Sequence, residues 1–380
     1  MNRFSVKPEV YFNEGSIKYL KTLKIDKALI VTDDMMVQVG VVDKVAEVLK
    51  SNCNEYKVFS KVKPDPPVEI VAMGVKVMTS FNPDVVIALG GGSSIDAAKS
   101  IIIFAANMMN KIGTSYKKPL FIAVPTTSGT GSEVTNFSVI TVEDKKFPII
   151  TNELIPDVAI VDADFVKTAP PKITADTAID ALTHAIEAYV STKASDYTDA
   201  LSEKSVKLIF KYLLSAYKDG TNIKARQKLH NASCMAGMAF TNASLGLNHG
   251  MAHALGGAFH IPHGRANAIL LPYIIKFNAN IELGVENEVA RRYAELSRIL
   301  GLPSSNVKEG VENLIFSIKV LLRETSTPST LKEVRINKEE FLEKIEVMAN
   351  NAMKDRCTIT NPRIVCLKDI IKLYLEAYEG

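Results

Sequence analysis

The chain has 380 residues, of which 47% are hydrophobic and 23% charged, and its formal net charge is +3. This length is sufficient for two domains with large cores, and no basic stripe is interleaved with aromatic residues, so we expect no nucleic-acid partner. The longest apolar runs are too short to span a bilayer, so we expect no membrane partner. Four cysteines without zinc-type spacing and the lack of a secretory signal favour a cytoplasmic protein with reduced thiols.

The first part of the chain alternates between short β-type runs and segments with helical spacing. The predicted strands are Lys27–Thr32, Tyr56–Phe59, Asp84–Leu89, Leu120–Val124, Phe137–Val142 and Val158–Val161. The predicted helices between them are Val41–Ser51, Val68–Phe81 and Ile95–Asn107. This alternation is typical of an α/β domain with a mostly parallel sheet.

The pattern changes near Pro170 and Pro171, beyond which almost every segment has helical spacing. The predicted helices are Thr177–Val190, Asp199–Tyr217, Ile223–Ala243, Leu247–Phe259, Ala266–Asn278, Glu286–Leu300, Val307–Leu322, Lys338–Asn350 and Leu367–Ala377. We therefore expect an α/β domain over residues 1–172 and an all-helical domain over residues 173–380.

Two glycine- and hydroxyl-rich loops follow predicted buried strands. Gly90–Lys99 reads GGGSSIDAAK and opens a helix, and Thr126–Ser132 follows the next strand. Glycines allow a phosphate to approach the backbone at a helix N-terminus, whereas a tight turn without a ligand is the alternative. Asp33 ends the first strand, where a carboxylate can bind a ribose diol and would repel a 2′-phosphate, unless it is only a solvated turn residue. The loops predict a dinucleotide, with NAD favoured over NADP.

The helix Ala175–Ser191 carries a polar stripe of Asp176, Asp180, His184 and Glu187. A carboxylate and an imidazole one turn apart, as in Asp180 and His184, can chelate one metal ion. A solvated polar face is the alternative reading, although the flanking residues are apolar.

All six histidines lie between residues 184 and 263, and Asn248–Gly264 contains four of them. His249 and His253 are one turn apart on a predicted helix, and His263 lies in an expected turn at its end. Spacing does not decide which of His249 and His253 is a ligand; His230 and His260 are taken as structural. Nitrogen and oxygen ligands without thiolate suit Fe(II), Zn(II), Mn(II) or Co(II), and a metal beside a nicotinamide predicts an oxidoreductase acting on an alcohol or carbonyl.

Four motifs resemble the iron-containing (group III) alcohol dehydrogenase family. They are GGGSSIDAAK at Gly90–Lys99, PTTSGTGSEVT at Pro125–Thr135, IDALTHAIEAY at Ile179–Tyr189 and LNHGMAHALGGAFHIPHGRANAILLP at Leu247–Pro272. The resemblance implies an α/β dinucleotide-binding domain, an all-helical metal-binding domain of the dehydroquinate synthase-like architecture, and a homodimer. Within the family, Thr192–Leu213 and Lys228–Gly250 look most like the 1-propanol dehydrogenase of propanediol-utilisation microcompartments.

The resemblance also implies site residues. The metal ligands would be Asp180, His184, His249 and His263, holding Fe2+ or alternatively Zn2+, with His253 as a catalytic neighbour. The implied NAD contacts are Asp33, Asp65, Gly91, Gly92, Ser93, Asp96, Thr126, Thr127, Thr130 and Lys146. Asp65 stands where several members of the family have Asn, which puts that contact in doubt.

The resulting expectation is an NADH-dependent reductase of short-chain aldehydes that converts propionaldehyde to 1-propanol, with microcompartment enzymes or shell proteins as partners. Lactaldehyde reductase, 1,3-propanediol dehydrogenase and butanol dehydrogenase are alternatives within the family. A lyase of the dehydroquinate synthase type is a further alternative. The Asp180–His184 pair disfavours it, because that family has a glutamate among its metal ligands. A non-catalytic NAD-binding protein would require the predicted metal face to bind no metal.

Overall fold

The computed structural model describes residues 3–113, 116–143, 145–281 and 286–380. The chain divides into two compact units, one formed by Ser5–Ala169 and the other mainly by Pro170–Gly380. The expected boundary after residue 172 falls inside α5 (Pro171–Val190), because Pro171 occupies the first turn of that helix, a position that suits proline. Within the described residues, no helix is both long and apolar enough to cross a membrane.

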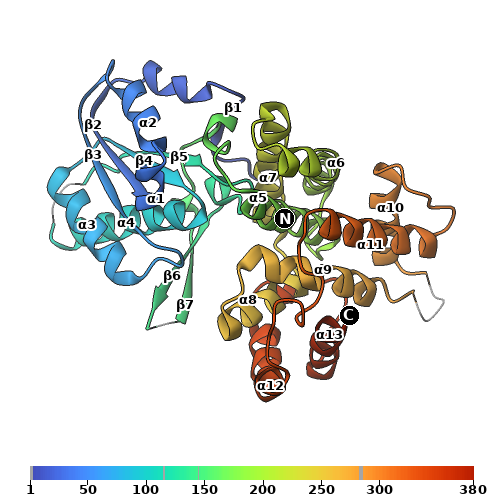
Figure 1. Cartoon of the computed structure of the whole chain (residues 1–380). Helices are drawn as coiled ribbons and strands as arrows, with labels where there is room; N and C mark the ends of the chain where they lie inside the picture. Colours follow the sequence, from blue (N-terminus) through green and yellow to red (C-terminus); the bar gives the residue numbers. More distant parts are fainter. Residues whose placement is uncertain (1–2, 114–115, 144, 282–285) are drawn as a thin grey trace. The chain divides into compact units, whose positions relative to one another are not determined.

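The unit Ser5–Ala169 is built on a parallel sheet, as the sequence predicted (Figure 1, blue to green). The strands in spatial order are β1 (Glu9–Phe12), β8 (Val158–Val161), β5 (Leu120–Pro125), β4 (Val85–Gly90), β2 (Ile25–Asp33) and β3 (Cys53–Val62). The run Phe137–Val142 does not join this sheet, because it forms β6 of an antiparallel hairpin with β7 (Lys145–Ile150).

Helices cover both faces of the sheet. Leu29 and Val31 of β2 pack in one cluster with α3 (Val68–Phe81) and α4 (Gly92–Lys111). Ala28 and Ile30 pack in the other cluster, with α2 (Val41–Leu49) and the 3-10 helix η1 (Ser16–Thr22). Because successive strand residues face opposite sides, burial on both faces explains the continuous apolar runs in the sequence. The short elements that complete this unit are α1 (Asp34–Gln38), η2 (Ser132–Val134), η3 (Asn152–Leu154) and η4 (Ala163–Phe165).

The strand order places a topological switch between β2 and β4. After β2 the chain adds β3 on one side and then crosses to β4 on the other. The carboxyl ends of β2, β4 and β5, at Asp33, Gly90 and Pro125, therefore lie at one edge of the sheet. In open α/β sheets, ligands bind at such an edge beside the switch point.

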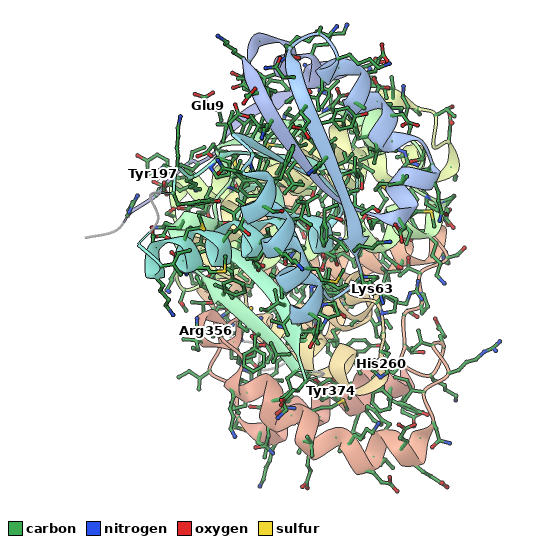
Figure 2. All side chains as sticks on the ribbon, turned by 90° about the vertical axis from the view of Figure 1, so that its left-hand side faces the viewer. Glu9, Lys63, Tyr197, His260, Arg356 and Tyr374 are labelled. Carbon is green, nitrogen blue, oxygen red and sulfur yellow. The ribbon has the colours of Figure 1, made fainter. Side chains whose placement is uncertain are left out.

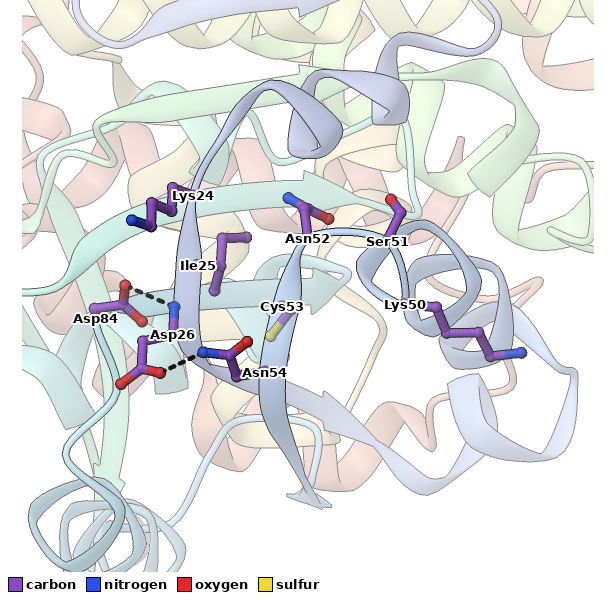
Figure 3. Close-up of a pocket in the computed structure, with 9 residues that line it drawn as sticks. All are labelled: Lys24, Ile25, Asp26, Lys50, Ser51, Asn52, Cys53, Asn54 and Asp84. Carbon is purple, nitrogen blue, oxygen red and sulfur yellow. Dashed lines mark hydrogen bonds between the residues drawn. The ribbon is translucent and has the colours of Figure 1, made fainter.

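The opposite edge of the sheet carries a surface hollow of about 500 Å³ around the start of β2 and β3 (Figure 3). Its polar groups bind one another: Asp84 accepts a hydrogen bond from the backbone N–H of Asp26, and Asn54 donates to the Asp26 carboxylate. These bonds join β2, β3 and the residue before β4. The polar groups of the hollow therefore stabilise the sheet.

The second unit is all-helical, again as predicted (Figure 1, yellow-green to red). Its helices are α5, α6 (Asp196–Lys218), α7 (Ile223–Ala243), α8 (Leu247–Phe259), α9 (His263–Ala279), α10 (Glu288–Ile299), α11 (Val307–Glu324), α12 (Lys338–Lys354) and α13 (Leu367–Glu379), with the 3-10 helix η6 (Thr358–Thr360). Every residue of α5 from Ala178 to Val190 is buried, so this helix forms the centre of the unit. A second cluster joins α8, α9, α12 and α13, where Tyr374 (Figure 2) donates a hydrogen bond to the Met251 carbonyl.

Candidate metal centre and nucleotide-binding edge

Four side chains that could ligate a metal ion converge from three helices of the helical unit. Asp180 and His184 come from α5, His249 from α8 and His263 from α9, and one candidate ligand atom of each lies within 4.8 Å of all the others. Asp180 Oδ1 is 3.5 Å from His263 Nε2 and 3.8 Å from His249 Nε2. The structure therefore brings together the four residues predicted as ligands.

The position of His263 differs from the one predicted from the sequence. It was expected in a turn at the end of the preceding helix, whereas it is the first residue of α9. The turn lies earlier, because His260 adopts a left-handed conformation (φ 53°) that ends α8, and Pro262 then precedes α9. His263 consequently belongs to the helix that also carries Asn267 one turn later.

The surroundings of the four groups suit a cation that is bound by neutral imidazoles. Asp180, His184 and His249 are only 3%, 5% and 1% exposed. Burial lowers the pKa of His249 well below its ordinary value, and burial raises the pKa of Asp180. Imidazole must be uncharged to bind a metal, and one carboxylate with three imidazoles is a donor set that fits Fe(II) or Zn(II). The residues present thus fit a divalent transition metal.

Asn267 is part of this site although no motif in the sequence marks it as a site residue. Its Nδ2 lies 2.7 Å from Asp180 Oδ1 and 3.1 Å from the Nε2 atoms of both His249 and His263. The only local signal was its spacing, four residues after His263 on one helix.

The two outer members of the polar stripe on α5, Asp176 and Glu187, form hydrogen bonds with residues of α9 and α8. Glu187 lies 2.5 Å from His249 Nδ1, and its pKa is raised to about 8 by burial. Asp176 accepts a 2.6 Å hydrogen bond from Arg265, which lies two residues after His263. The alternative reading of this stripe as a solvated face is wrong, since Asp176 is 7% and Glu187 4% exposed.

His253 lies beside the four-residue cluster and belongs to a different set of contacts. Its side chain is 41% exposed, and its ring stacks on that of His263 with centroids 5.2 Å apart. Its Nδ1 lies 2.9 Å from Asp355 Oδ2. Burial alone would raise the pKa of Asp355, but hydrogen bonds from His253 and Cys357 together lower it. An ionised Asp355 accepts a hydrogen bond from the Nδ1–H of His253, which leaves Nε2 as the other ring nitrogen for proton exchange.

The remaining two histidines lie outside this cluster. His230 is buried in α7 at 1% exposure, and His260 is exposed at the end of α8, where Figure 2 labels it. Neither is among the described residues that could share a metal with Asp180.

The predicted nucleotide-binding residues gather at the carboxyl edge of the sheet in the other unit. Asp33 ends β2, and its carboxylate accepts a hydrogen bond from Met36 N at the start of α1. Gly91 precedes α4, and a Cβ at Gly92 would lie 2.9 Å from Thr130 Cγ2, so the two loops contact each other. The predicted contacts that lie in or next to these two loops are Gly91, Gly92, Ser93, Asp96, Thr126, Thr127 and Thr130.

Asp96 and Lys99 of the first loop bind the second loop and the strand beyond it. Asp96 accepts hydrogen bonds from the Ser132 hydroxyl at 2.6 Å and from Val139 N at 3.0 Å, which engages both carboxylate oxygens. Lys99 is 1% exposed, and its ammonium donates to Ser132 and to Thr135. Burial lowers the pKa of Lys99 to about 8. In the sequence, Lys99 is marked only as the last residue of the GGGSSIDAAK motif, and no local pattern indicates this contact.

The last two predicted contacts pair with each other. Lys146 Nζ in β7 lies 2.7 Å from Asp65 Oδ1, and both side chains are exposed. Asp65 has a left-handed backbone (φ 47°), which aspartate tolerates better than most residues. An exposed pair of this kind leaves both side chains able to turn toward a ligand.

Comparisons with known proteins cover both units. Residues 8–163 match the family model described as iron-containing alcohol dehydrogenase, and residues 174–378 match that of the Fe-containing alcohol dehydrogenase family, C-terminal. The chain is 42% identical to the NADPH-dependent butanol dehydrogenase of Clostridium saccharobutylicum, over 100% of this chain and 99% of the relative. It is also 42% identical to the 1-propanol dehydrogenase PduQ of Citrobacter freundii, over 96% of each chain. Among solved structures, sulfoacetaldehyde reductase from Bifidobacterium kashiwanohense in complex with NAD+ is similar, with a TM-score of 0.86 and 26% identity over 100% of this chain and 99% of that one.

Proposed function

The chain belongs to the iron-containing alcohol dehydrogenase family, and from this premise we propose that it reduces short-chain aldehydes to primary alcohols with NADH at a divalent iron centre. The convergence of Asp180, His184, His249 and His263 is the observation that supports the proposal most strongly. A bound Fe2+ would supply Lewis-acid polarisation of the aldehyde carbonyl, and a bound NADH would supply the hydride.

The residues of the helical unit then have distinct roles. Asp180, His184, His249 and His263 hold the cation, and burial keeps His249 in its uncharged, ligating form. Nε2 of His253 takes up a proton from solvent and passes it to the product oxygen, while Asp355 holds the Nδ1–H of the same ring. The exposure of His253 suits a group that exchanges protons with water.

The other unit binds the dinucleotide at the carboxyl edge of its sheet. The N-terminus of α4 and the hydroxyl groups of Thr127 and Thr130 bind the phosphates. Asp33 binds the adenosine ribose and disfavours a 2′-phosphate, because its carboxylate is fixed at the end of β2 by Met36 N. This supports NAD(H), although one relative of equal similarity is NADPH-dependent.

The substrate is a C3 or C4 aldehyde, with propionaldehyde proposed first. One relative acts on 1-propanol and the other on butanol, at the same identity of 42%. The similarity to the 1-propanol dehydrogenase PduQ is the ground for proposing a role in propanediol utilisation, with microcompartment enzymes or shell proteins as partners. The homodimer is proposed from the family resemblance alone. Light scattering of the purified protein measures the oligomeric state, and sedimentation with shell proteins measures the association.

The experiment that tests the function is aldehyde-dependent oxidation of NADH by anaerobically purified protein. We expect activity with propionaldehyde and butyraldehyde that disappears on chelation and returns when Fe2+ is added. Inactivity of the iron-loaded protein toward every short-chain aldehyde tested would contradict the proposal. A comparison of kcat/KM for the two aldehydes decides between the C3 and C4 substrates.

A further inference from the structure

Glu187 is a buried carboxylate whose two oxygens contact different groups. It lies on α5, three residues after His184, and is 4% exposed. Its Oε2 lies 2.5 Å from Nδ1 of His249, and its Oε1 accepts a 2.7 Å hydrogen bond from the backbone N–H of Asn248. One side chain therefore contacts both the ring of a candidate ligand and the backbone of the helix that carries it.

The backbone contact replaces a missing helix cap. The residue before α8 is Gly246, which has no side chain to cap the first N–H groups of the helix. Glu187 Oε1 supplies the acceptor for one of them, the N–H of Asn248. A Cβ at Gly246 would lie 2.8 Å from Glu187 Oε1, so the glycine allows the carboxylate to approach this closely.

The ring contact determines which nitrogen of His249 is available. The positive charge of a bound cation favours the ionised form of Glu187. An ionised carboxylate only accepts hydrogen bonds, so in the metal-bound protein Nδ1 of His249 carries the proton. In a neutral imidazole the other nitrogen, Nε2, is then bare. Nε2 is the atom that lies 3.8 Å from Asp180 Oδ1 inside the four-residue cluster.

We propose that Glu187 is a positioning residue that holds the Nδ1–H of His249 and thereby presents the bare Nε2 of this ring to the metal ion. The inference rests on the proposed metal centre and assigns a role to the one member of the stripe on α5 that neither ligates nor pairs with an arginine. A carboxylate that accepts from a ligating histidine also fixes the ring orientation.

The variant Glu187→Gln tests this role because an amide has only one acceptor oxygen. If that oxygen keeps the hydrogen bond from the backbone N–H of Asn248, the NH2 group faces Nδ1 of His249. The ring proton then moves to Nε2, the nitrogen that the metal needs. If the amide turns, its NH2 group faces the N–H of Asn248 instead. Either way the side chain cannot satisfy both contacts, so metal affinity falls by about 10- to 100-fold.

The control is Glu203→Gln, which removes the same charge from a carboxylate that accepts a hydrogen bond from Tyr189 on α5 and contacts no candidate ligand. Zn2+ affinity is measured by competition with a chelator for the wild type and both variants, with circular dichroism to verify folding. We expect Glu203→Gln to bind like the wild type. A Glu187→Gln affinity within about threefold of the wild type would overturn the inference.

A second readout does not depend on affinity. In the Zn2+-loaded wild type, the Nδ1 proton of His249 should give a strongly downfield proton NMR signal, absent from His249→Ala and from Glu187→Gln. If Glu187→Gln does not fold, the wild-type spectrum still decides, because absence of the signal overturns the inference. A wild type that binds no Zn2+ or Fe2+ would instead refute the proposed metal centre, so the two failures are distinguishable.

Discussion

Arg265 Nη2 lies 2.6 Å from Asp176 Oδ2, and this ion pair joins the first turn of α9 to the start of the polar stripe on α5. The two side chains are 12% and 10% exposed. Burial already raises the pKa of Asp176, so removal of its partner would leave a poorly solvated carboxylate.

Arg265→Met should therefore lower the free energy of unfolding by about 3 kcal/mol, measured by urea denaturation. The matched control is Arg298→Met, whose pair with Glu295 is 44% and 46% exposed and should contribute less than about 1 kcal/mol. Equal effects of the two substitutions would show that the Asp176 contact is not a buried pair in solution.

His263→Ala and His253→Ala should separate metal binding from proton transfer. His263→Ala removes a candidate ligand, so we expect metal and activity to be lost together. His253→Ala leaves the four-residue cluster intact, so the metal content should be unchanged while the rate falls by about 100-fold. Both are measured by metal analysis and NADH oxidation on the same samples. Loss of metal in His253→Ala would show that the ligand assignment is wrong.

Asp33→Asn should shift the cofactor preference toward NADPH. The amide oxygen can keep the hydrogen bond from Met36 N that caps α1, while the negative charge is removed. We expect kcat/KM with NADPH to rise by about tenfold, the equivalent of about 1.4 kcal/mol of relieved repulsion. Asp33→Gly should also raise the activity with NADPH, but it would lose the hydrogen bond that caps the N-terminus of α1. An unchanged ratio of NADPH to NADH activity would exclude Asp33 as the selecting residue.

Lys99 should give the protein a specific dependence of stability on pH. Its pKa in the folded protein is about 8, below the ordinary 10.5, because the ammonium is buried. Between these values the unfolded chain binds the proton that the folded chain has released, so raising the pH favours folding. The loss of stability caused by burying the charged ammonium is present in full below pH 8, and it disappears as the pH approaches 10.5.

The measurement is urea denaturation of the wild type and Lys99→Met at several pH values, from about half a unit below the folded pKa of about 8 to about half a unit below the ordinary 10.5. We expect the stability difference between the two proteins to move in favour of the wild type as the pH rises. A difference that does not change with pH would show that the pKa of Lys99 is not lowered.

Local patterns in the sequence were sufficient for most of the fold. The helices Val68–Phe81, Ile223–Ala243 and Leu247–Phe259 have the predicted bounds, because their apolar spacing and flanking residues are local features. Strand pairing is not local: the pattern of Phe137–Val142 predicts a strand, but it does not indicate that this strand pairs with β7 in a separate antiparallel hairpin.

The site shows the same division between local and tertiary information. One turn of helix relates Asp180 to His184, and spacing identified that pair. His249 and His253 are also one turn apart, and only packing distinguishes them, with side-chain exposures of 1% and 41%. The role of Asn267 depends on how α5, α8 and α9 meet, which no spacing rule describes.

The central claim is that this chain reduces aldehydes at an iron centre held by Asp180, His184, His249 and His263. Its most direct test is an anaerobic titration of metal-free protein with Fe2+, with the rate of propionaldehyde-dependent NADH oxidation followed at each addition. The account predicts a rate that rises linearly to about one equivalent of Fe2+ per chain and then levels off, as expected for a single four-ligand site, with no such rise in His263→Ala. A rate that does not depend on added Fe2+, or that rises equally in His263→Ala, would contradict it.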